Sequence, residues 1–320
     1  MSTNVYAIAI DVGGVFIKAA VLNAAGGVLM DTVMIYPSRS EADRETLLGH
    51  LASVVEQQAA KIIDKKYAIS GIGFAFPGPF DYENGVCFIR GLGKFDHIYG
   101  VNLREELSHR LLANKSLRRR MASPFPIVFE NDASLFALGE WLSGEAGPYE
   151  RSICITLGSG TGSAFLEGGR LVKDRADVPP NGWVYNSPFR DSIVDDYISK
   201  RGILRLAAEH GLDPALDVKE IADLARSGSA AAAEVFRRFG SWTGEMLRPF
   251  VDRFRPQAVV IGGQIAKSAD LFREALDEAL AAPQVDVRFS RQANISAFVG
   301  VAKLLADHRA AGPEDRAQYG

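Results

Sequence analysis

Cysteine and net charge are both scarce in this sequence. Only two cysteines, Cys87 and Cys154, occur among 320 residues, and they lie far apart in apolar stretches. This placement indicates neither a disulfide framework nor a cysteine-based metal site, and it suits a reducing compartment. The formal net charge is −3, without a dominant acidic or basic tail, and 47% of the residues are apolar. Such a composition is typical of an ordinary globular protein, and the length allows two domains.

Long hydrophobic runs are also missing. No stretch approaches the length of a membrane span, and the N-terminal segment has no basic region and too short an apolar run for a signal peptide. We therefore expect a cytoplasmic protein without a membrane partner. The basic cluster Lys115–Arg120 is more typical of a solvated surface than of a nucleic-acid site in a chain of negative net charge. We expect no nucleic-acid partner.

Two glycine loops each follow an apolar segment typical of a strand. Asp11-Val12-Gly13-Gly14 follows residues 5–10, and Thr156–Gly162 follows residues 152–155. Glycine permits positive φ and lets backbone N–H groups approach phosphate oxygens without a Cβ in the way. The first loop alone is more typical of a plain hairpin. Two such loops in one chain, framing a third motif, indicate a nucleotide cleft.

The third motif is Phe129-Glu130-Asn131-Asp132-Ala133, which follows the apolar pair at 127–128. Apolar residues at helical spacing begin soon after it, so Asp132 is expected at or next to a helix N-terminus. One interpretation is a simple helix cap, a common role of Asn and Asp. The alternative uses the same geometry, because the partial positive charge of the helix start would keep Asp132 ionised and ready to accept a proton from an attacking hydroxyl.

Apolar periodicity predicts alternating strands and helices in both halves of the chain. The expected strands cover residues 5–10, 16–22, 28–36, 69–76, 127–128 and 152–155, with a further strand and glycine turn over 256–265. A first helix is expected to run to residue 64 behind a capping box of Ser40 and Asp43. Further helices are expected over 102–112, after Asp132, and over 195–212, 218–226, 229–253, 269–280 and 297–307. The repeated organisation predicts two related α/β lobes around a cleft.

These motifs, taken together, resemble the ROK family of bacterial sugar kinases and sugar-responsive repressors, within the superfamily that includes hexokinase and actin. The resemblance extends from Asp11 to the final helix. The matching segments are Asp11–Gly14 with Lys18 (first phosphate loop), Gly71–Pro79 (sugar-side strand and turn), Glu130–Ala133 (catalytic segment), Thr156–Gly162 (second phosphate loop) and Val260–Gly263 (adenosine-side turn).

The resemblance implies an α/β fold of two ribonuclease-H-like lobes, of the actin and hexokinase type, around a nucleotide and sugar cleft. The smaller lobe would contain residues 1–128 and 298–320, and the larger lobe residues 129–297. It also implies ATP-dependent phosphorylation of a hydroxyl on a sugar or sugar-like polyol, with ATP and Mg²⁺ as cofactors, by a homodimer.

The roles of individual residues follow from the same resemblance. Asp132 would be the general base, and Asp11 would hold Mg²⁺ through water. Pro77, Gly78 and Asn131 would face the acceptor. The implied nucleotide-binding residues are Asp11, Gly13, Gly14, Lys18, Gly158, Ser159, Gly160, Thr161, Gly162, Gly262 and Gly263.

Three departures from the family pattern bear on the substrate. Val15 replaces the usual threonine of the first loop and removes a hydroxyl near the phosphates. Residues 182–186 carry Trp183 and Asn186 where the family has a Glu and a His that hold sugar hydroxyls. The Cys-rich zinc segment that normally follows is absent from residues 187–197, so no structural zinc is expected.

The acceptor is therefore expected to differ from glucose-like sugars. Trp183 is expected to lie against the apolar face of a ring, with Lys94, Asp96, His97 and Asn102 either supplying replacement contacts or forming a solvated loop. An uncommon hexose, an amino sugar and a cyclitol are the candidates. The alternative function is a kinase-like sugar sensor without turnover. A DNA-binding repressor is disfavoured, because the first strand begins near Val5 and leaves no room before it for a helix-turn-helix.

Overall fold

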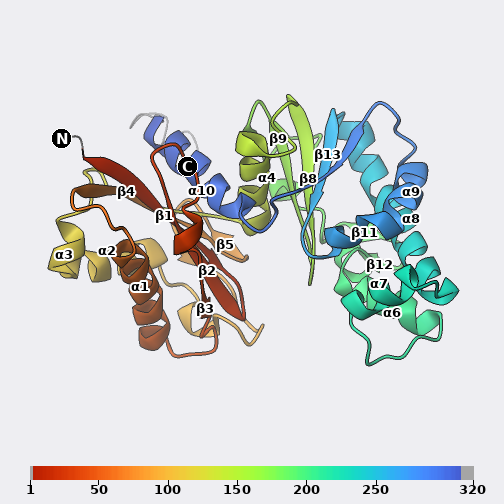
Figure 1. Ribbon diagram of the computed structural model, residues 1–320, viewed down its shortest axis with the longest axis horizontal. Helices are drawn as coiled ribbons and strands as arrows, with labels where there is room; N and C mark the ends of the chain where they lie inside the picture. Colours follow the sequence, from red (N-terminus) through yellow and green to blue (C-terminus); the bar gives the residue numbers. More distant parts are fainter. Residues whose placement is uncertain (1–2, 311–320) are drawn as a thin grey trace. The chain divides into compact units, whose positions relative to one another are not determined.

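The structure, a computed structural model, describes residues 3–310. The chain divides into two compact units. The first contains the residues up to Gly139 and those from Ile295 onward, and the second contains Glu140–Asn294. Each unit is built on a five-stranded sheet with helices packed on it (Figure 1). Within residues 3–310, no helix is long and apolar enough to span a membrane.

The sheet of the first unit has the strand order β3-β2-β1-β4-β7. β2 is antiparallel to both β1 and β3, whereas β1, β4 and β7 are parallel. The strands cover Asn4–Val12 (β1), Phe16–Leu22 (β2), Met34–Pro37 (β3), Tyr67–Ala75 (β4) and Ile127–Glu130 (β7). Because parallel strands end at the same edge of a sheet, the residues that follow β1, β4 and β7 share one edge.

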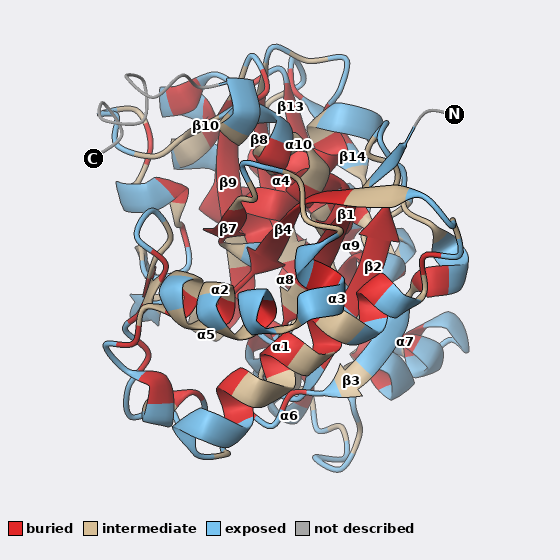
Figure 2. Cartoon of the chain, turned by 90° about the vertical axis from the view of Figure 1, so that its left-hand side faces the viewer, coloured by how far each residue is buried: buried red, intermediate tan, exposed pale blue. Residues whose placement is uncertain are grey.

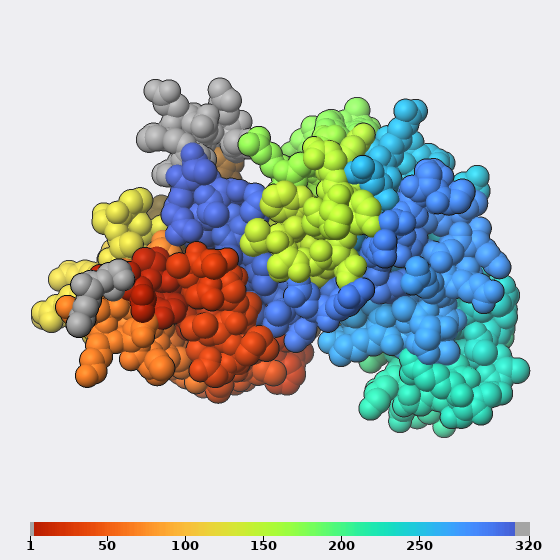
Figure 3. Space-filling model, turned by 45° about the horizontal axis from the view of Figure 1, so that its top comes forward, coloured from red at the N-terminus to blue at the C-terminus, as the bar shows by residue number. Residues whose placement is uncertain are grey.

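Alternating side chains on β4 explain how helices cover both faces of this sheet. Phe74 joins the buried core that includes residues of α1 (Arg44–Ala60). Gly73 faces the other way, where α10 (Ser296–Ala310) packs so closely that a Cβ on Gly73 would lie 2.4 Å from Val301 Cγ1. Segments from the two ends of the chain therefore lie side by side (Figure 3).

The second unit repeats this plan. Its sheet has the order β10-β9-β8-β13-β14, with β9 antiparallel to β8 and β10, and with β8, β13 and β14 parallel. The strands cover Arg151–Leu157 (β8), Thr161–Glu167 (β9), Arg170–Val172 (β10), Ala258–Gly262 (β13) and Asp286–Phe289 (β14). The repeated strand order confirms the expected pair of related α/β lobes.

Helices pack tightly in the second unit. α8 (Ala230–Phe254) and α9 (Ala269–Leu280) approach so closely that a Cβ on Gly240 would lie 2.2 Å from the carbonyl oxygen of Phe272.

The strands of the two five-stranded sheets are mostly buried, as Figure 2 shows. The remaining α-helices are α2 (Leu103–Ala113), α3 (Lys115–Arg118), α4 (Asp132–Ser143), α5 (Val194–Tyr197), α6 (Lys200–Glu209) and α7 (Val218–Arg226). The short strands are β5 (Phe80–Asp81), β6 (Val86–Cys87), β11 (Pro188–Phe189) and β12 (Ser192–Ile193), and short 3₁₀ helices lie at Met30–Thr32, Asp96–Ile98, Pro180–Gly182 and Ile265–Ser268.

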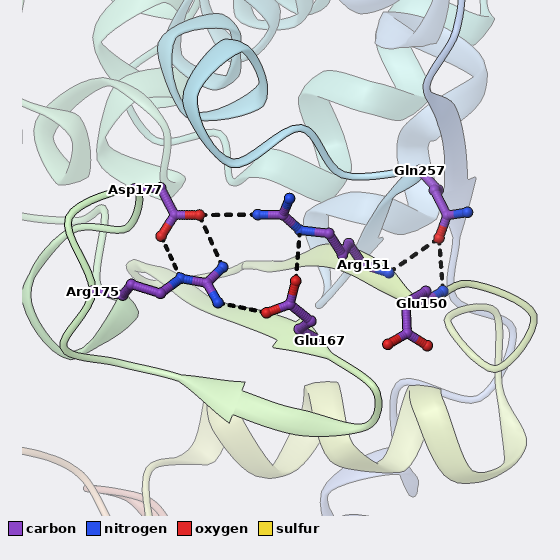
Figure 4. Close-up of polar contacts among 6 residues, drawn as sticks. All are labelled: Glu150, Arg151, Glu167, Arg175, Asp177 and Gln257. Atoms are coloured by element: carbon purple, nitrogen blue, oxygen red, sulfur yellow. Dashed lines mark hydrogen bonds and ion pairs between the residues drawn. The ribbon is translucent and has the colours of Figure 1, made fainter.

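An ion-pair network ties the start of β8 to the segment after β10 (Figure 4). Asp177 accepts from Arg151 at 2.9 Å and from Arg175 at 2.6 Å, while Glu167 pairs with both arginines. The Arg151 guanidinium also lies 4.3 Å from the centre of the buried Phe254 ring. This network lies at the start of β8, whereas the second glycine loop follows the end of that strand, so we assign it a structural role.

The expected strand over 28–36 is wrong in its first half. Met30–Thr32 form a 3₁₀ turn, and only Met34–Pro37 are a strand. The reason is the Thr32 hydroxyl, which donates to the Leu29 carbonyl at 2.6 Å and accepts from the Val21 N–H at 2.9 Å. These two bonds fold the segment back onto β2.

The expected capping box is also wrong. Asp43 is the N-cap of α1 and accepts from the Thr46 N–H at 3.0 Å, whereas the Ser40 hydroxyl donates to the Gly14 carbonyl at 2.6 Å. The boundary between the units also differs from the expected one at residue 128, since residues 129–139 belong to the first unit. The cause is the pairing of β7 with β4, which holds Ile127–Glu130 in the first sheet.

Candidate active site

The first glycine loop is the turn between β1 and β2. Asp11 and Lys18 are directly opposite in the two strands, and the Lys18 Nζ lies 3.4 Å from an Asp11 carboxylate oxygen. The Gly13 N–H donates to the Phe16 carbonyl at 2.9 Å and closes the turn. Neither Gly13 nor Gly14 has a left-handed φ, so positive φ is not what requires glycine in this loop. Glycine is required for space, because a Cβ on Gly14 would lie 2.6 Å from Lys94 Cδ.

Two carbonyl groups of this loop are hydrogen-bonded, whereas the N–H groups of Gly14 and Val15 are free among the described residues. The Gly14 carbonyl accepts from the Ser40 hydroxyl at 2.6 Å, and the Val15 carbonyl accepts from the Ser38 N–H at 2.9 Å. Within the described part of the chain, the N–H groups of Gly14 and Val15 have no hydrogen-bond acceptor. Consecutive free N–H groups in a turn are suited to an anion.

Asn131 and Asp132 have different roles at the start of α4. Asn131 Oδ1 accepts from the Ala133 N–H at 3.0 Å and the Ser134 N–H at 3.4 Å, so Asn131 is the helix cap. Its amide also donates to the Tyr82 hydroxyl at 3.4 Å. Asp132 is the first helical residue and is exposed to solvent. The capping interpretation therefore applies to Asn131, and the Asp132 carboxylate is available for chemistry.

The surroundings of Asp132 raise its pKa. Desolvation by the surrounding protein is the main cause, and the negative charge of Asp11 adds to it. The Ala133 N–H, 2.9 Å from Asp132 Oδ1, acts in the opposite direction. The sequence predicted that the helix start would favour the ionised form, whereas the net shift favours protonation and makes the carboxylate a stronger base.

Asp11 is half-buried in the same part of the first unit. Burial raises the pKa of its carboxyl, and the positive charge of Lys18 lowers it. The charge of Asp11 in turn contributes to the shift at Asp132, so the two carboxylates lie within electrostatic range of each other. Asp11 lies near the end of β1 and Asp132 follows β7, at one edge of the sheet.

Pro77 and Gly78 lie beside Asn131 at this edge. They follow β4, whose last residue pairs with the last residue of β7. The Phe76 N–H donates to the Glu130 carbonyl at 3.0 Å, and the Tyr82 hydroxyl donates to the Phe76 carbonyl at 2.9 Å. The structure thus brings together the residues predicted for the catalytic step and for one side of the acceptor.

The loop between β6 and α2 contains the other polar residues predicted for the acceptor. The Asp96 carboxylate accepts from the N–H groups of Gly91 and Gly93, and Asn102 caps α2 by accepting from the Glu105 N–H at 3.2 Å. Both side chains thus have local structural roles. His97 is exposed, and Lys94 lies across the first glycine loop.

In the second unit, the second glycine loop and the turn after β13 lie side by side. Gly262 pairs with Thr156, and a Cβ on Gly263 would lie 2.2 Å from the Leu157 carbonyl oxygen. Gly263 has a φ of +93°, which glycine adopts freely. Gly158 and Gly160 are not left-handed, and their loop is closed by a 3.0 Å hydrogen bond from the Gly158 N–H to the Gly160 carbonyl.

Asp195 contacts the second glycine loop and was not identified from the sequence. Its carboxylate accepts from the Thr161 N–H at 2.6 Å, lies 2.8 Å from the position of a Cβ on Gly160, and forms an ion pair with Arg201. Asp195 and Thr161 are 34 residues apart, and no local pattern connects them. One amide group of the loop is thus occupied by a carboxylate of the chain itself.

Trp183 and Asn186 lie on a segment attached to β9. The Ser163 hydroxyl donates to the Gly182 carbonyl at 2.7 Å and accepts from the Val184 N–H at 2.9 Å. Trp183 is half-buried, with its ring 6.1 Å from that of Tyr185, and Asn186 is exposed. Ser159 lies in the glycine loop that leads into β9, and Thr161 and Gly162 are the first two residues of that strand.

A sequence model of the ROK family matches residues 7–308. A glucokinase of Streptomyces coelicolor is 24% identical, with 94% of this chain and 97% of that protein covered. An N-acetyl-D-glucosamine kinase of Haemophilus influenzae is 25% identical over 85% of this chain and 88% of that protein. A xylose repressor of Caldicellulosiruptor bescii is 23% identical over 85% of this chain and 69% of that protein.

Solved structures show the same fold. A glucokinase from Parabacteroides distasonis superposes with a TM-score of 0.78 at 22% identity, covering 96% of this chain and 99% of that one. A ROK family glucokinase from Streptomyces griseus, in complex with glucose and AMPPNP, superposes with a TM-score of 0.71 at 20% identity, covering 94% and 99%.

Proposed function

The chain belongs to the ROK family, and from this membership and the geometry of its first unit we propose that it is an ATP-dependent kinase that phosphorylates a hydroxyl of a sugar or sugar-like polyol. The relatives include both sugar kinases and repressors, so the family alone does not decide between catalysis and sensing. One observation carries the proposal. Asp132 is exposed at the start of α4, and the charge of Asp11 raises its pKa. Asn131, and not Asp132, is the helix cap, so the Asp132 carboxylate is available for catalysis.

In the proposed reaction, Asp132 accepts the proton of the attacking hydroxyl. A carboxylate with a raised pKa is a better proton acceptor than an ordinary one, and a positioned general base contributes about 10²- to 10⁴-fold to the rate. The remaining task in phosphoryl transfer is to position the reactants and neutralise charge. The free N–H groups of Gly14 and Val15 supply part of this function in the first unit.

The residues of the first unit fit a magnesium ion. Mg²⁺ favours oxygen ligands and usually binds through one or two carboxylates together with substrate phosphates and water. The Asp11 carboxylate is half-buried, and its pairing with Lys18 at 3.4 Å is long enough to leave oxygen lone pairs free. Asp11 would hold the ion, and the ion would neutralise phosphate charge.

The proposed acceptor is not glucose. Residues 182–186 carry the aromatic rings of Trp183 and Tyr185 and the exposed amide of Asn186, without a carboxylate or an imidazole. A site that lacks such partners loses roughly 1.5–3 kcal/mol for each hydrogen bond to a charged group. An uncommon hexose, an amino sugar or a cyclitol is the proposed substrate, and the proposed assembly is a homodimer, which sedimentation analysis tests.

A kinase-like sensor is the second candidate, and one observation favours it. The Asp195 carboxylate occupies the Thr161 N–H in the second glycine loop, where a phosphate donor would need that group. In a sensor this contact would persist. In a kinase, ATP would displace it.

A phosphate-transfer screen with ATP and Mg²⁺ across hexoses, N-acetyl sugars and cyclitols tests the proposal, with the Asp132→Asn variant as the matched control. We expect turnover of at least one compound, loss of that turnover in the variant, and a kcat/KM for glucose far below that of the best acceptor. Sugar binding without turnover of any compound would favour the sensor. Glucose turnover as efficient as that of any other compound would overturn the proposed acceptor class.

A further inference from the structure

Lys94 lies across the first glycine loop. A Cβ built on Gly14 would be 2.6 Å from Lys94 Cδ, 3.1 Å from its Cε and 3.0 Å from its Nζ. The aliphatic stem and the ammonium group therefore both cover the space above Gly14. Lys94 was expected, with Asp96, His97 and Asn102, to contact the acceptor or to belong to a solvated loop. Its side chain is instead directed to the first glycine loop.

The backbone next to Lys94 is held in place by Phe95. Phe95 is buried, packs 5.2 Å from the Phe76 ring, and donates its N–H to the Ser40 carbonyl at 2.6 Å. Ser40 in turn donates its hydroxyl to the Gly14 carbonyl at 2.6 Å. Ser40 therefore links the segment of Lys94 to the first glycine loop through these two hydrogen bonds. The proximity of Lys94 to Gly14 follows from the fold of the first unit.

The ammonium group of Lys94 is exposed and has no carboxylate partner within the described residues. Lys18, the other cation at this loop, pairs with Asp11. The Gly14 and Val15 N–H groups beside Lys94 also have no acceptor among residues 3–310. Three unpaired donors, one of them charged, therefore lie close together at what we call the Gly14 corner, defined by Gly14, Val15 and Lys94.

We propose that Lys94 binds the terminal phosphoryl group of ATP and stabilises it during transfer. This inference rests on the proposed kinase function. A lysine ammonium is a compact point charge that binds phosphate oxygens well, and two backbone N–H groups next to it complete an anion site. Val15 has no side-chain hydrogen-bond donor, so Lys94 supplies the side-chain donor at this corner, and that donor is charged.

The terminal phosphoryl group is the part of ATP that fits this corner. Asp132 must contact the acceptor hydroxyl, which attacks the terminal phosphorus in line. Asp11, Asp132 and the Gly14 corner all belong to the first unit, where Asp11 lies near the end of β1 and Asp132 follows β7, at one edge of the sheet. Groups in this neighbourhood therefore face the phosphoryl group that is transferred. If Lys94 instead contacted the acceptor, its removal would weaken acceptor binding and leave nucleotide binding unchanged.

Calorimetry with Lys94→Met, Lys94→Arg and Lys66→Met tests the inference, using ADP and the non-hydrolysable ATP analogue AMPPNP as probes. Methionine keeps an unbranched apolar stem over Gly14 and removes only the charge. Lys66 is exposed just before β4, at the opposite end of that strand from the site, so its variant controls for the general loss of one positive charge. We expect Lys94→Met to bind AMPPNP about ten- to a hundredfold more weakly, the range for a lost hydrogen bond to a charged group, and ADP within threefold of the parent. Lys94→Arg should retain most of the AMPPNP affinity, and Lys66→Met all of it.

Kinetics with the best acceptor provide a second readout. We expect Lys94→Met to lower kcat and raise the KM for ATP, with the KM for the acceptor unchanged. Unchanged AMPPNP affinity in Lys94→Met, an equal loss for ADP, or a change in acceptor KM alone would each overturn the inference. If the parent protein binds AMPPNP through Lys94 but phosphorylates no compound, the proposed kinase function fails while the assignment of Lys94 stands.

Discussion

Two neighbouring substitutions should separate catalysis from stability at the start of α4. Asp132→Asn is expected to reduce turnover at least a hundredfold, the low end of what loss of a general base costs. The new amide can still accept from the Ala133 N–H through Oδ1, as the carboxylate does at 2.9 Å. Asn131→Ala removes the two capping bonds at 3.0 and 3.4 Å, and should cost about 1 kcal/mol of unfolding free energy.

The direction of the stability effect at Asp132 follows from its pKa. The folded state raises this pKa, chiefly through desolvation and then through the charge of Asp11, so ionised Asp132 opposes folding once the pH exceeds its unfolded pKa. Asp132→Asn removes that charge. The variant should therefore be at least as stable as the parent at pH 7, and the difference should vanish below the unfolded pKa of aspartate, about 3.9.

The assay combines steady-state kinetics on the best acceptor with differential scanning calorimetry. Asn131→Ala should lower Tm by roughly 2–4 °C, whereas Asp132→Asn should not lower it. The opposite pattern, with Asp132→Asn keeping turnover within tenfold of the parent, would refute the assignment of the general base. A large loss of stability in Asp132→Asn would show that Asp132 shares the capping role.

Three further outcomes are expected. Gly160→Val should weaken ATP binding much more than acceptor binding, because the new side chain would intrude where the phosphates approach the backbone of the second glycine loop; unchanged ATP affinity by calorimetry would contradict this. Asp177→Asn should lower Tm at pH 7, because the hydrogen bond from Arg175 lowers the pKa of Asp177 in the folded state. This stabilisation is present above the unfolded pKa of the carboxyl and is lost as the pH falls through the lower, folded pKa. Calorimetric scans should therefore show the Tm difference from the parent disappearing toward about pH 2. Turnover should require Mg²⁺, and elemental analysis of the purified protein should find no stoichiometric zinc; one tightly held zinc per chain would show that residues 182–197 have been misinterpreted.

Local patterns predicted much of the framework. Helices α7 and α9 cover the predicted residues 218–226 and 269–280, because each has a clear apolar stripe and its own boundary signals. The hairpin of β1 and β2 was also predictable, since two apolar runs flank one glycine turn. Signals of this kind act within a few residues, so a single sequence contains them completely.

The remaining features depend on partners far apart in the sequence. Ser40 was expected to cap a helix, yet its hydroxyl binds the carbonyl of Gly14, 26 residues away. Lys94 covers Gly14 from 80 residues away, and Asp195 reaches Thr161 from 34. No periodicity or capping rule connects such pairs, because tertiary packing determines which of several local hydrogen-bonding options a polar side chain takes.

The close approach of α10 to Gly73 also constrains the order in which the molecule can be assembled. The chain enters the first unit, leaves it after Gly139, builds the whole second unit, and returns only at Ile295. During synthesis, the second unit can therefore be complete while one face of the first sheet still lacks its helix, exposing the apolar and glycine-lined surface that α10 later covers. The first lobe to be translated is the last to be finished, and until then the glycine face of β4 is a surface that a chaperone or another nascent chain can occupy.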